Sequence, residues 1–203
     1  SPGRYAAWAI QVVRGCWDAH RFTVGGSADD AGMGTLDLRR VIAVNPDQWS
    51  GDLSAFFEAY YPGVVYVPVE ADRPEAVHAW CSDVPPLPEE PPTEALTWPF
   101  GLPRTSYART YVLLPPDADA TWAEAVVEAT WDRYRFTIGG SADDAAIGDL
   151  DVRRVIAVNP ARWKGDLEAF FEIHYPGVEW IPIRVDAPEA LASAFVEAGV
   201  IER

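Results

Sequence analysis

Two short stretches of this chain of 203 residues place a serine and two aspartates directly after a pair of glycines. Glycine lets a backbone turn tightly or approach a ligand closely. Two carboxylates at such a turn can perform general acid/base catalysis, as in glycoside hydrolysis, or bind a hard cation through oxygen ligands. The candidate residues are Ser27, Asp29 and Asp30 in the first stretch, and Ser141, Asp143 and Asp144 in the second.

The same residues also fit a structural role. Ser-x-x-Asp matches the capping box, in which the serine caps a helix and an acidic residue three positions later bonds back to the cap. Acidic residues in a first turn also complement the helix dipole. We favour capping for the serines and for Asp30 and Asp144. Asp29 and Asp143 then have no assigned capping bond and are the first residues to mutate.

A second candidate site follows the next apolar run in each stretch. It consists of Asn45 and Trp49, and of Asn159 and Trp163. An amide and an aromatic ring at a strand end can face a sugar or another small ligand. The alternative, which we favour, is that the asparagine bonds the turn backbone and the tryptophan packs beneath the loop.

Several chemistries are disfavoured. The formal net charge is −15 and Lys164 is the only lysine, so the chain would repel nucleic acid and anionic membranes, whereas a neutral or cationic small ligand suits it. No Gly-Lys-Ser/Thr loop or G-x-G-x-x-G fingerprint cradles a phosphate. No His-Glu-x-x-His or cysteine-histidine cluster indicates zinc. We therefore assign no metal site and no cofactor.

The chain contains two cysteines, Cys16 and Cys81. A disulfide between them is one alternative, but spacing alone does not establish it. We favour the other, two small buried hydrophobic thiols.

The recurrence of these motifs reflects an internal duplication. Ser27 and Ser141 differ by 141 − 27 = 114 positions, and this offset aligns residues 8–76 with the second half without a gap. Over residues 17–76, about two thirds of the aligned positions are identical. We predict a first repeat over residues 1–84, a stiff proline-rich linker over 85–106 and a second repeat over 107–203.

Hydrophobic periodicity predicts the elements that position the candidate residues. In the second repeat the expected strands are 111–116, 135–140, 152–158 and 178–185, and the expected helices are 121–131, a segment after Asp166 as N-cap, and 188–198. The predicted fold class is α/β, with two tandem pseudo-symmetric repeats in the order β-α-β-β-α-β-α. A ferredoxin-like α+β sandwich and one closed barrel built from both halves are the alternatives.

The first repeat lacks a counterpart of the first strand, since Pro2 aligns with Pro116. We expect an upstream strand or domain, the linker or a protein partner to cover the sheet edge left open, because an unpaired edge invites pairing.

We therefore expect a non-catalytic ligand-binding or protein-interaction module that is part of a larger protein. The alternative is a hydrolase, with glycans as candidate substrates, that uses the duplicated carboxylates. The sequence predicts no compartment and no oligomeric state.

Overall fold

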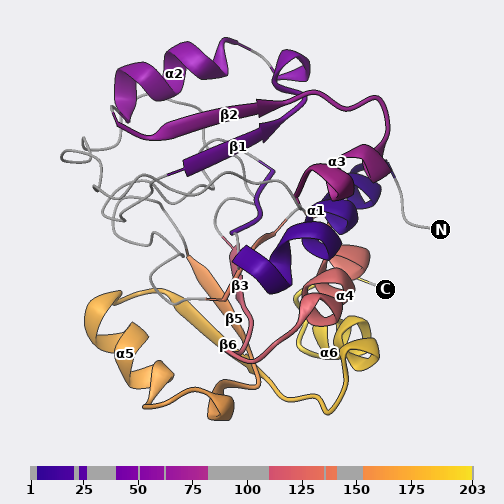
Figure 1. Ribbon diagram of the computed structural model, residues 1–203. Helices are drawn as coiled ribbons and strands as arrows, with labels where there is room; N and C mark the ends of the chain where they lie inside the picture. Colours follow the sequence, from indigo (N-terminus) through magenta and orange to yellow (C-terminus); the bar gives the residue numbers. More distant parts are fainter. Residues whose placement is uncertain are drawn as a thin grey trace.

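A computed structural model describes residues 4–20, 23–26, 40–49, 51–61, 63–81, 110–134, 136–140 and 153–202. The fold of these residues is mixed α/β, with six α-helices and two small parallel sheets (Figure 1). The elements of the first half are α1 (Arg4–His20), β1 (Arg40–Val44), η2 (Pro46–Gln48), α2 (Leu53–Tyr60), β2 (Val65–Val69) and α3 (Pro74–Cys81). Those of the second half are β3 (Thr110–Leu113), α4 (Ala120–Thr130), β4 (Thr137–Gly139), β5 (Arg154–Val158), η5 (Pro160–Arg162), α5 (Leu167–His174), β6 (Glu179–Ile183), η6 (Pro188–Ala190) and α6 (Leu191–Glu197).

The larger sheet belongs to the second half and has the strand order β4-β3-β5-β6. Every neighbouring pair in it is parallel. The ferredoxin-like alternative is therefore wrong, because it requires β4 and β5 to run as antiparallel strands of a hairpin-like unit. The smaller sheet pairs β1 with β2, also in parallel. The described strands form these two open sheets and not one closed barrel.

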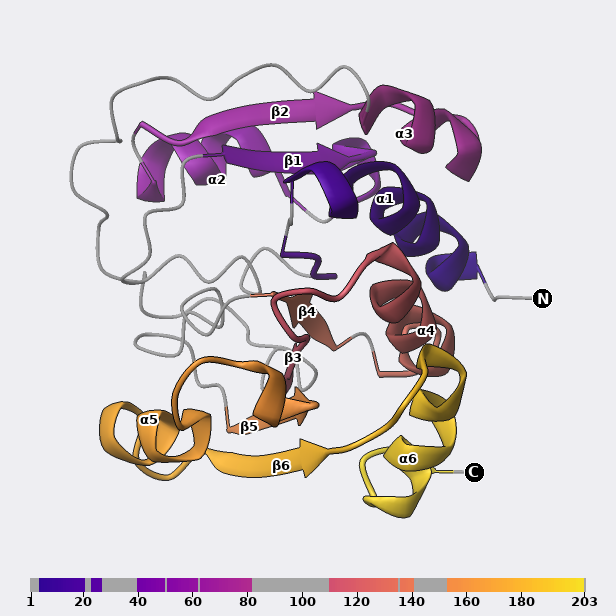
Figure 2. The same cartoon turned by 60° about the horizontal axis from the view of Figure 1, so that its bottom comes forward.

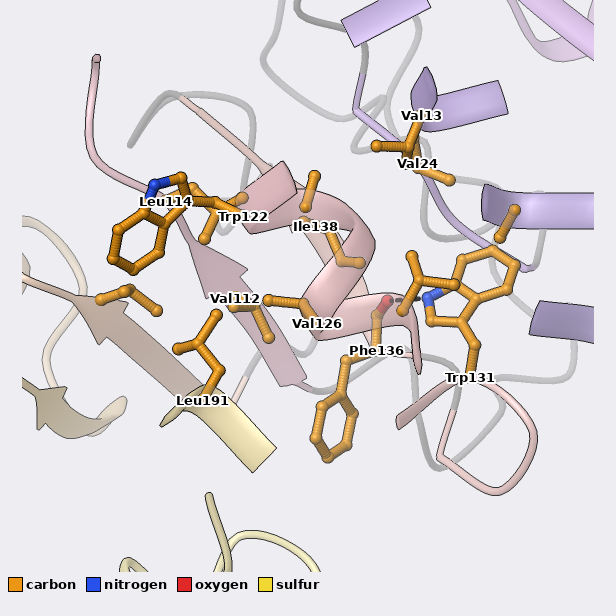
Figure 3. Close-up of a cluster of buried hydrophobic side chains, with 14 of the residues drawn as sticks. Val13, Val24, Val112, Leu114, Trp122, Val126, Trp131, Phe136, Ile138 and Leu191 are labelled. Carbon is orange, nitrogen blue, oxygen red and sulfur yellow. Dashed lines mark hydrogen bonds between the residues drawn. The ribbon is translucent and has the colours of Figure 1, made fainter. Parts of the chain in front are cut away.

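Helices cover both faces of the larger sheet, and the apolar side chains that follow Thr110 in β3 alternate between these faces. Val112 and Leu114 join a cluster with Val126 of α4 and Leu191 of α6 (Figure 3). Tyr111 and Leu113 join a second cluster, which contains Leu167 and Phe171 of α5. The second half is thus a three-layer arrangement with the sheet in the middle.

Aspartate caps begin the helices that follow β1 and β5. The carboxylate of Asp166 accepts a hydrogen bond of 3.1 Å from the N–H of Ala169, and that of Asp52 accepts one of 3.0 Å from Ala55. Such a cap satisfies a backbone donor that has no partner within the helix. The prediction of Asp166 as an N-cap is confirmed.

The two halves meet where α1 packs on α4 (Figures 1 and 2). The apolar residues of α1 recur at helical spacing and enter the same cluster as α4. They are Ala6, Ala9, Ile10, Val13 and Trp17. Arg14 forms an ion pair with Glu124 across this junction, and that hydrogen bond raises the pKa of Arg14.

Three backbone contacts between the halves follow the offset of 114: two hydrogen bonds to aspartates that are reciprocal, and one strand-like bridge between counterparts. The N–H of Ala6 donates to Asp132 at 3.2 Å, and the N–H of Ala120 donates to Asp18 at 2.9 Å. Each donor and each acceptor is the sequence counterpart of the other (6 + 114 = 120; 18 + 114 = 132). Val24 pairs in antiparallel fashion with its own counterpart, Ile138, through two hydrogen bonds of 3.0 Å each.

A disulfide joins Cys16 of α1 to Cys81 of α3, so the expectation of two free buried thiols is wrong. The Cα atoms are 5.2 Å apart, within the usual range of roughly 4.4–6.8 Å. Gly15 permits this approach, because a Cβ at that position would lie 2.9 Å from both the Cβ of Cys81 and the carbonyl oxygen of His78.

Ten aromatic side chains, five in each half at positions 114 apart, are buried or half-buried. They are Trp8, Trp17, Phe56, Phe57, Tyr61, Trp122, Trp131, Phe170, Phe171 and Tyr175. The indole of Trp131 also donates a hydrogen bond of 3.0 Å to the carbonyl of Phe136, which ties the end of α4 to the start of β4 (Figure 3).

Candidate functional site

The aspartate-containing stretches lie outside the described residues. This applies to Ser27, Asp29 and Asp30 and to Ser141, Asp143 and Asp144. Both the capping and the carboxylate-site interpretations of these residues therefore remain predictions, and with them the hydrolase alternative. The description of the chain stops after Gly26 and resumes at Arg40 in the first half, and it stops after Gly140 and resumes at Arg153 in the second.

Gly139, the last residue of β4, has a structural reason to be glycine. A Cβ at this position would overlap the hydroxyl and ring of Tyr111 in the neighbouring strand β3. Tyr111 is only 1% exposed, so its ring has little room to move aside. The close backbone approach inferred from the sequence is thus an approach to a side chain of the protein itself.

The two asparagines of the second candidate site adopt the same left-handed backbone conformation. Asn45 has a φ of 49° and Asn159 has a φ of 48°. Asparagine tolerates this region better than most residues. At both positions this conformation lets the chain turn sharply from the end of a strand into a short 3₁₀ helix.

The amide side chains join the carboxyl ends of adjacent parallel strands. Oδ1 of Asn159 accepts a hydrogen bond of 3.0 Å from the N–H of Val185, and Nδ2 donates one of 2.9 Å to the carbonyl of the same residue. Oδ1 of Asn45 accepts one of 2.8 Å from the N–H of Ala71. Both asparagines bond backbone groups, but the prediction that they bond the turn itself is wrong, because the bonded backbone follows the next strand.

Replacement of Asn159 by alanine is expected to lower the free energy of unfolding by about 2–3 kcal/mol, because two hydrogen bonds are lost and alanine is disfavoured at positive φ. Glycine at 159 keeps the backbone conformation and loses only the bonds, so its effect should be smaller. Urea unfolding followed by circular dichroism measures both. Equal effects of alanine and glycine would show that backbone conformation contributes nothing at this position.

The two tryptophans of this site differ in their surroundings. Trp163 is half-buried and packs against the cluster that contains Phe171, and its buried indole N–H has no partner among the described residues. Trp49 is 36% exposed. Trp163 therefore packs against the apolar interior, whereas Trp49 is more exposed to solvent.

Sequence reasoning missed a charged group at the carboxyl end of the larger sheet. Arg162 forms an ion pair with Asp117, and its guanidinium lies 5.7 Å from the ring centre of Trp122. In the sheet, β4 lies on one side of β3 and β5 lies on the other, so the direction of winding reverses at β3. Open parallel sheets bind ligands at such a switch point, at the carboxyl ends of the strands. The first half has Gln48 in place of Arg162, so a search for shared residues could not find it.

The described part of the first half carries acidic groups around β2. Burial raises the pKa of Tyr66, and the nearby carboxylates of Asp52, Asp47 and Glu70 raise it further. The phenol therefore stays neutral to higher pH than a free tyrosine does.

The described residues contain neither a metal-binding cluster nor a membrane-spanning helix. They include no group of three or more histidine, cysteine, aspartate or glutamate side chains arranged to hold a metal ion. Within the same ranges, no helix combines the length and the apolar character needed to cross a membrane.

Comparison with protein-family models, with curated proteins and with solved structures finds no match.

Proposed function

We propose that this chain is a non-catalytic protein-interaction module, built from two tandem pseudo-symmetric α/β units, and that its contact surface is the free edge of β1. The observation that carries the proposal is a difference between two strands of identical sequence. β1 and β5 both read Arg-Val-Ile-Ala-Val. β5 is paired on both sides, by β3 and β6, whereas β1 pairs only with β2 among the described strands.

The burial of the two strands differs accordingly. Val155, Ile156 and Val158 of β5 are each 0% exposed. Their counterparts in β1 are all partly exposed: Val41, Ile42 and Val44. A strand with this much β-branched apolar surface, and with one edge that no described strand pairs, is a template for pairing with another chain. The edge of β1 is thus suited to adding a strand from a partner.

The reciprocal junction supports the two-unit architecture. In a two-fold interface, residue i of one unit contacts residue j of the other, and residue j of the first contacts residue i of the second. The hydrogen bonds of Ala6 and Ala120 follow this rule, and Val24 with Ile138 fits a pair on the axis itself. The junction between the halves therefore has the form of a dimer interface within one chain.

Hydrogen exchange tests whether the edge is free. In the isolated chain, amides of residues 41–44 are expected to exchange at least about tenfold faster than those of residues 155–158, because strand pairing on both sides slows local opening. Mass spectrometry or NMR of the exchanging chain measures the two segments side by side, and the identical sequences remove differences in intrinsic rate. Equal protection of the two strands would mean that the edge is already covered, and would contradict the proposed function.

A further inference from the structure

We infer that the partner at β1 is an extended apolar segment of another protein, which adds as a parallel strand in the register that Thr110–Leu113 takes on β5. The inference rests on the proposed function and specifies the chemistry of the partner. The chain contains its own template for the contact, because β3 occupies the corresponding position in the second half.

The template fixes the register. Thr110, Tyr111, Val112 and Leu113 lie opposite Arg154, Val155, Ile156 and Ala157, respectively. The offset of 114 maps these four β5 residues onto Arg40, Val41, Ile42 and Ala43. Four consecutive partner residues are therefore expected to pair with residues 40–43.

The template also fixes the direction. β3 runs parallel to β5, and it lies between β5 and β4. Val24 is the counterpart of Ile138 in β4. The segment around Val24 therefore corresponds to β4, and the partner strand would lie between that segment and β1. Parallel and antiparallel strands place their hydrogen bonds differently, and β1 and β5 have the same sequence and the same parallel pairing to an outer strand. We therefore expect a parallel partner.

Packing on both faces determines the composition of the partner. Tyr111, Val112 and Leu113 are at most 1% exposed, because helices cover both sides of β3. In the first half, Phe57 of α2 is the counterpart of Phe171 of α5 and is already 3% exposed. A strand enclosed on both faces is apolar at consecutive positions, and a central strand excludes proline. The expected partner segment is apolar, rich in β-branched or aromatic residues and free of proline at the paired positions.

A peptide with the sequence of residues 108–117 is the direct probe, because it carries the template strand with a charged residue near each end. Its binding to the intact, isotope-labelled chain is measured by NMR titration. We expect a dissociation constant of roughly 10 µM to 1 mM, with shifts centred on residues 40–44. The matched control peptide carries Val112→Pro and should bind at least about tenfold more weakly. A spin label at either end of the peptide reports its direction.

A second variant supplies the strand within the chain. The sequence of residues 108–114 is fused ahead of Ser1, where the repeat register places it. This fusion is expected to slow exchange at residues 41–44 and to abolish binding of the free peptide. If the fused chain still bound the peptide as tightly as the parent chain does, the site would lie elsewhere and the inference would be wrong.

The outcomes separate the two proposals. Fast exchange at residues 41–44 without peptide binding, or with binding in the antiparallel direction, would overturn this inference and leave the interaction module standing. Protection of residues 41–44 in the free chain, equal to that of residues 155–158, would show that a segment of the chain itself covers the edge. That result would overturn both proposals.

Discussion

Replacement of Cys16 and Cys81 by alanine is expected to lower the free energy of unfolding by about 4 kcal/mol. The bond joins positions 65 apart in sequence, and closing a loop of that length removes about 4 kcal/mol of chain entropy from the unfolded state. The first half needs this constraint more than the second does, because its described sheet has only two strands. A two-stranded sheet is marginal without further packing.

The second half offers a matched control for this experiment. The counterparts of Cys16 and Cys81 are Thr130 and Phe195, which are 2% and 0% exposed and lie on the contacting helices α4 and α6. The double variant Cys16→Thr/Cys81→Phe copies that arrangement and should lose less stability than the alanine variant. Guanidinium unfolding with and without a reductant measures the effect. If the parent chain unfolded at the same denaturant concentration in both conditions, the disulfide would contribute nothing to stability.

Replacement of Trp17 by alanine is expected to lower the free energy of unfolding by about 3–5 kcal/mol, the usual range for a large buried aromatic residue. Trp17 is 0% exposed and lies in the cluster formed by α1 and α4. Its indole N–H also donates a hydrogen bond of 3.2 Å to the carbonyl of Ala118 in the second half. The substitution therefore removes packing and a polar contact that both hold the halves together.

Trp49 provides the control, because it is the same residue type but is 36% exposed. Its replacement by alanine should change the free energy of unfolding by less than about 1 kcal/mol. Trp17→Phe retains most of the packing and loses the hydrogen bond, so its effect should lie between the two. Urea unfolding monitored by circular dichroism compares the three variants, and similar losses for Trp17→Ala and Trp49→Ala would contradict a central role for the junction.

Local features of the fold were predictable from sequence because they depend on neighbouring residues. Periodicity located the strands of the second half, and the position of Asp166 before an apolar stripe located a helix start. The parallel direction of β5 was not predictable, because it depends on which strands become neighbours. The disulfide was not predictable for a similar reason, since the distance between Cys16 and Cys81 depends on how α3 docks on α1.

Duplication was informative for shared residues and misleading for those that differ. The arginines that open β1 and β5 are an example, because their surroundings differ. Arg154 forms an ion pair with Glu179 at 2.9 Å. The counterpart of Glu179 is Val65, and the buried Nε of Arg40 has no hydrogen-bond partner among the described residues. Within the candidate site, only the backbone hydrogen bonding of Asn45 and Asn159 was predictable from the sequence, because asparagine at a strand end commonly bonds nearby backbone. Arg162 was not, because it occurs in one half alone.

The reciprocal hydrogen bonds between the halves have a consequence for assembly. The second half carries both a donor of this contact, Ala120, and an acceptor, Asp132. Ile138 likewise pairs with a residue that occupies its own position in the other half. The backbone hydrogen bonds that join the halves are therefore self-complementary, but the charged pair beside them is not. The counterpart of Arg14 is Glu128 (14 + 114 = 128), so two second halves would place a glutamate opposite Glu124, where the first half offers an arginine. The charge at the junction thus favours the pairing of unlike halves.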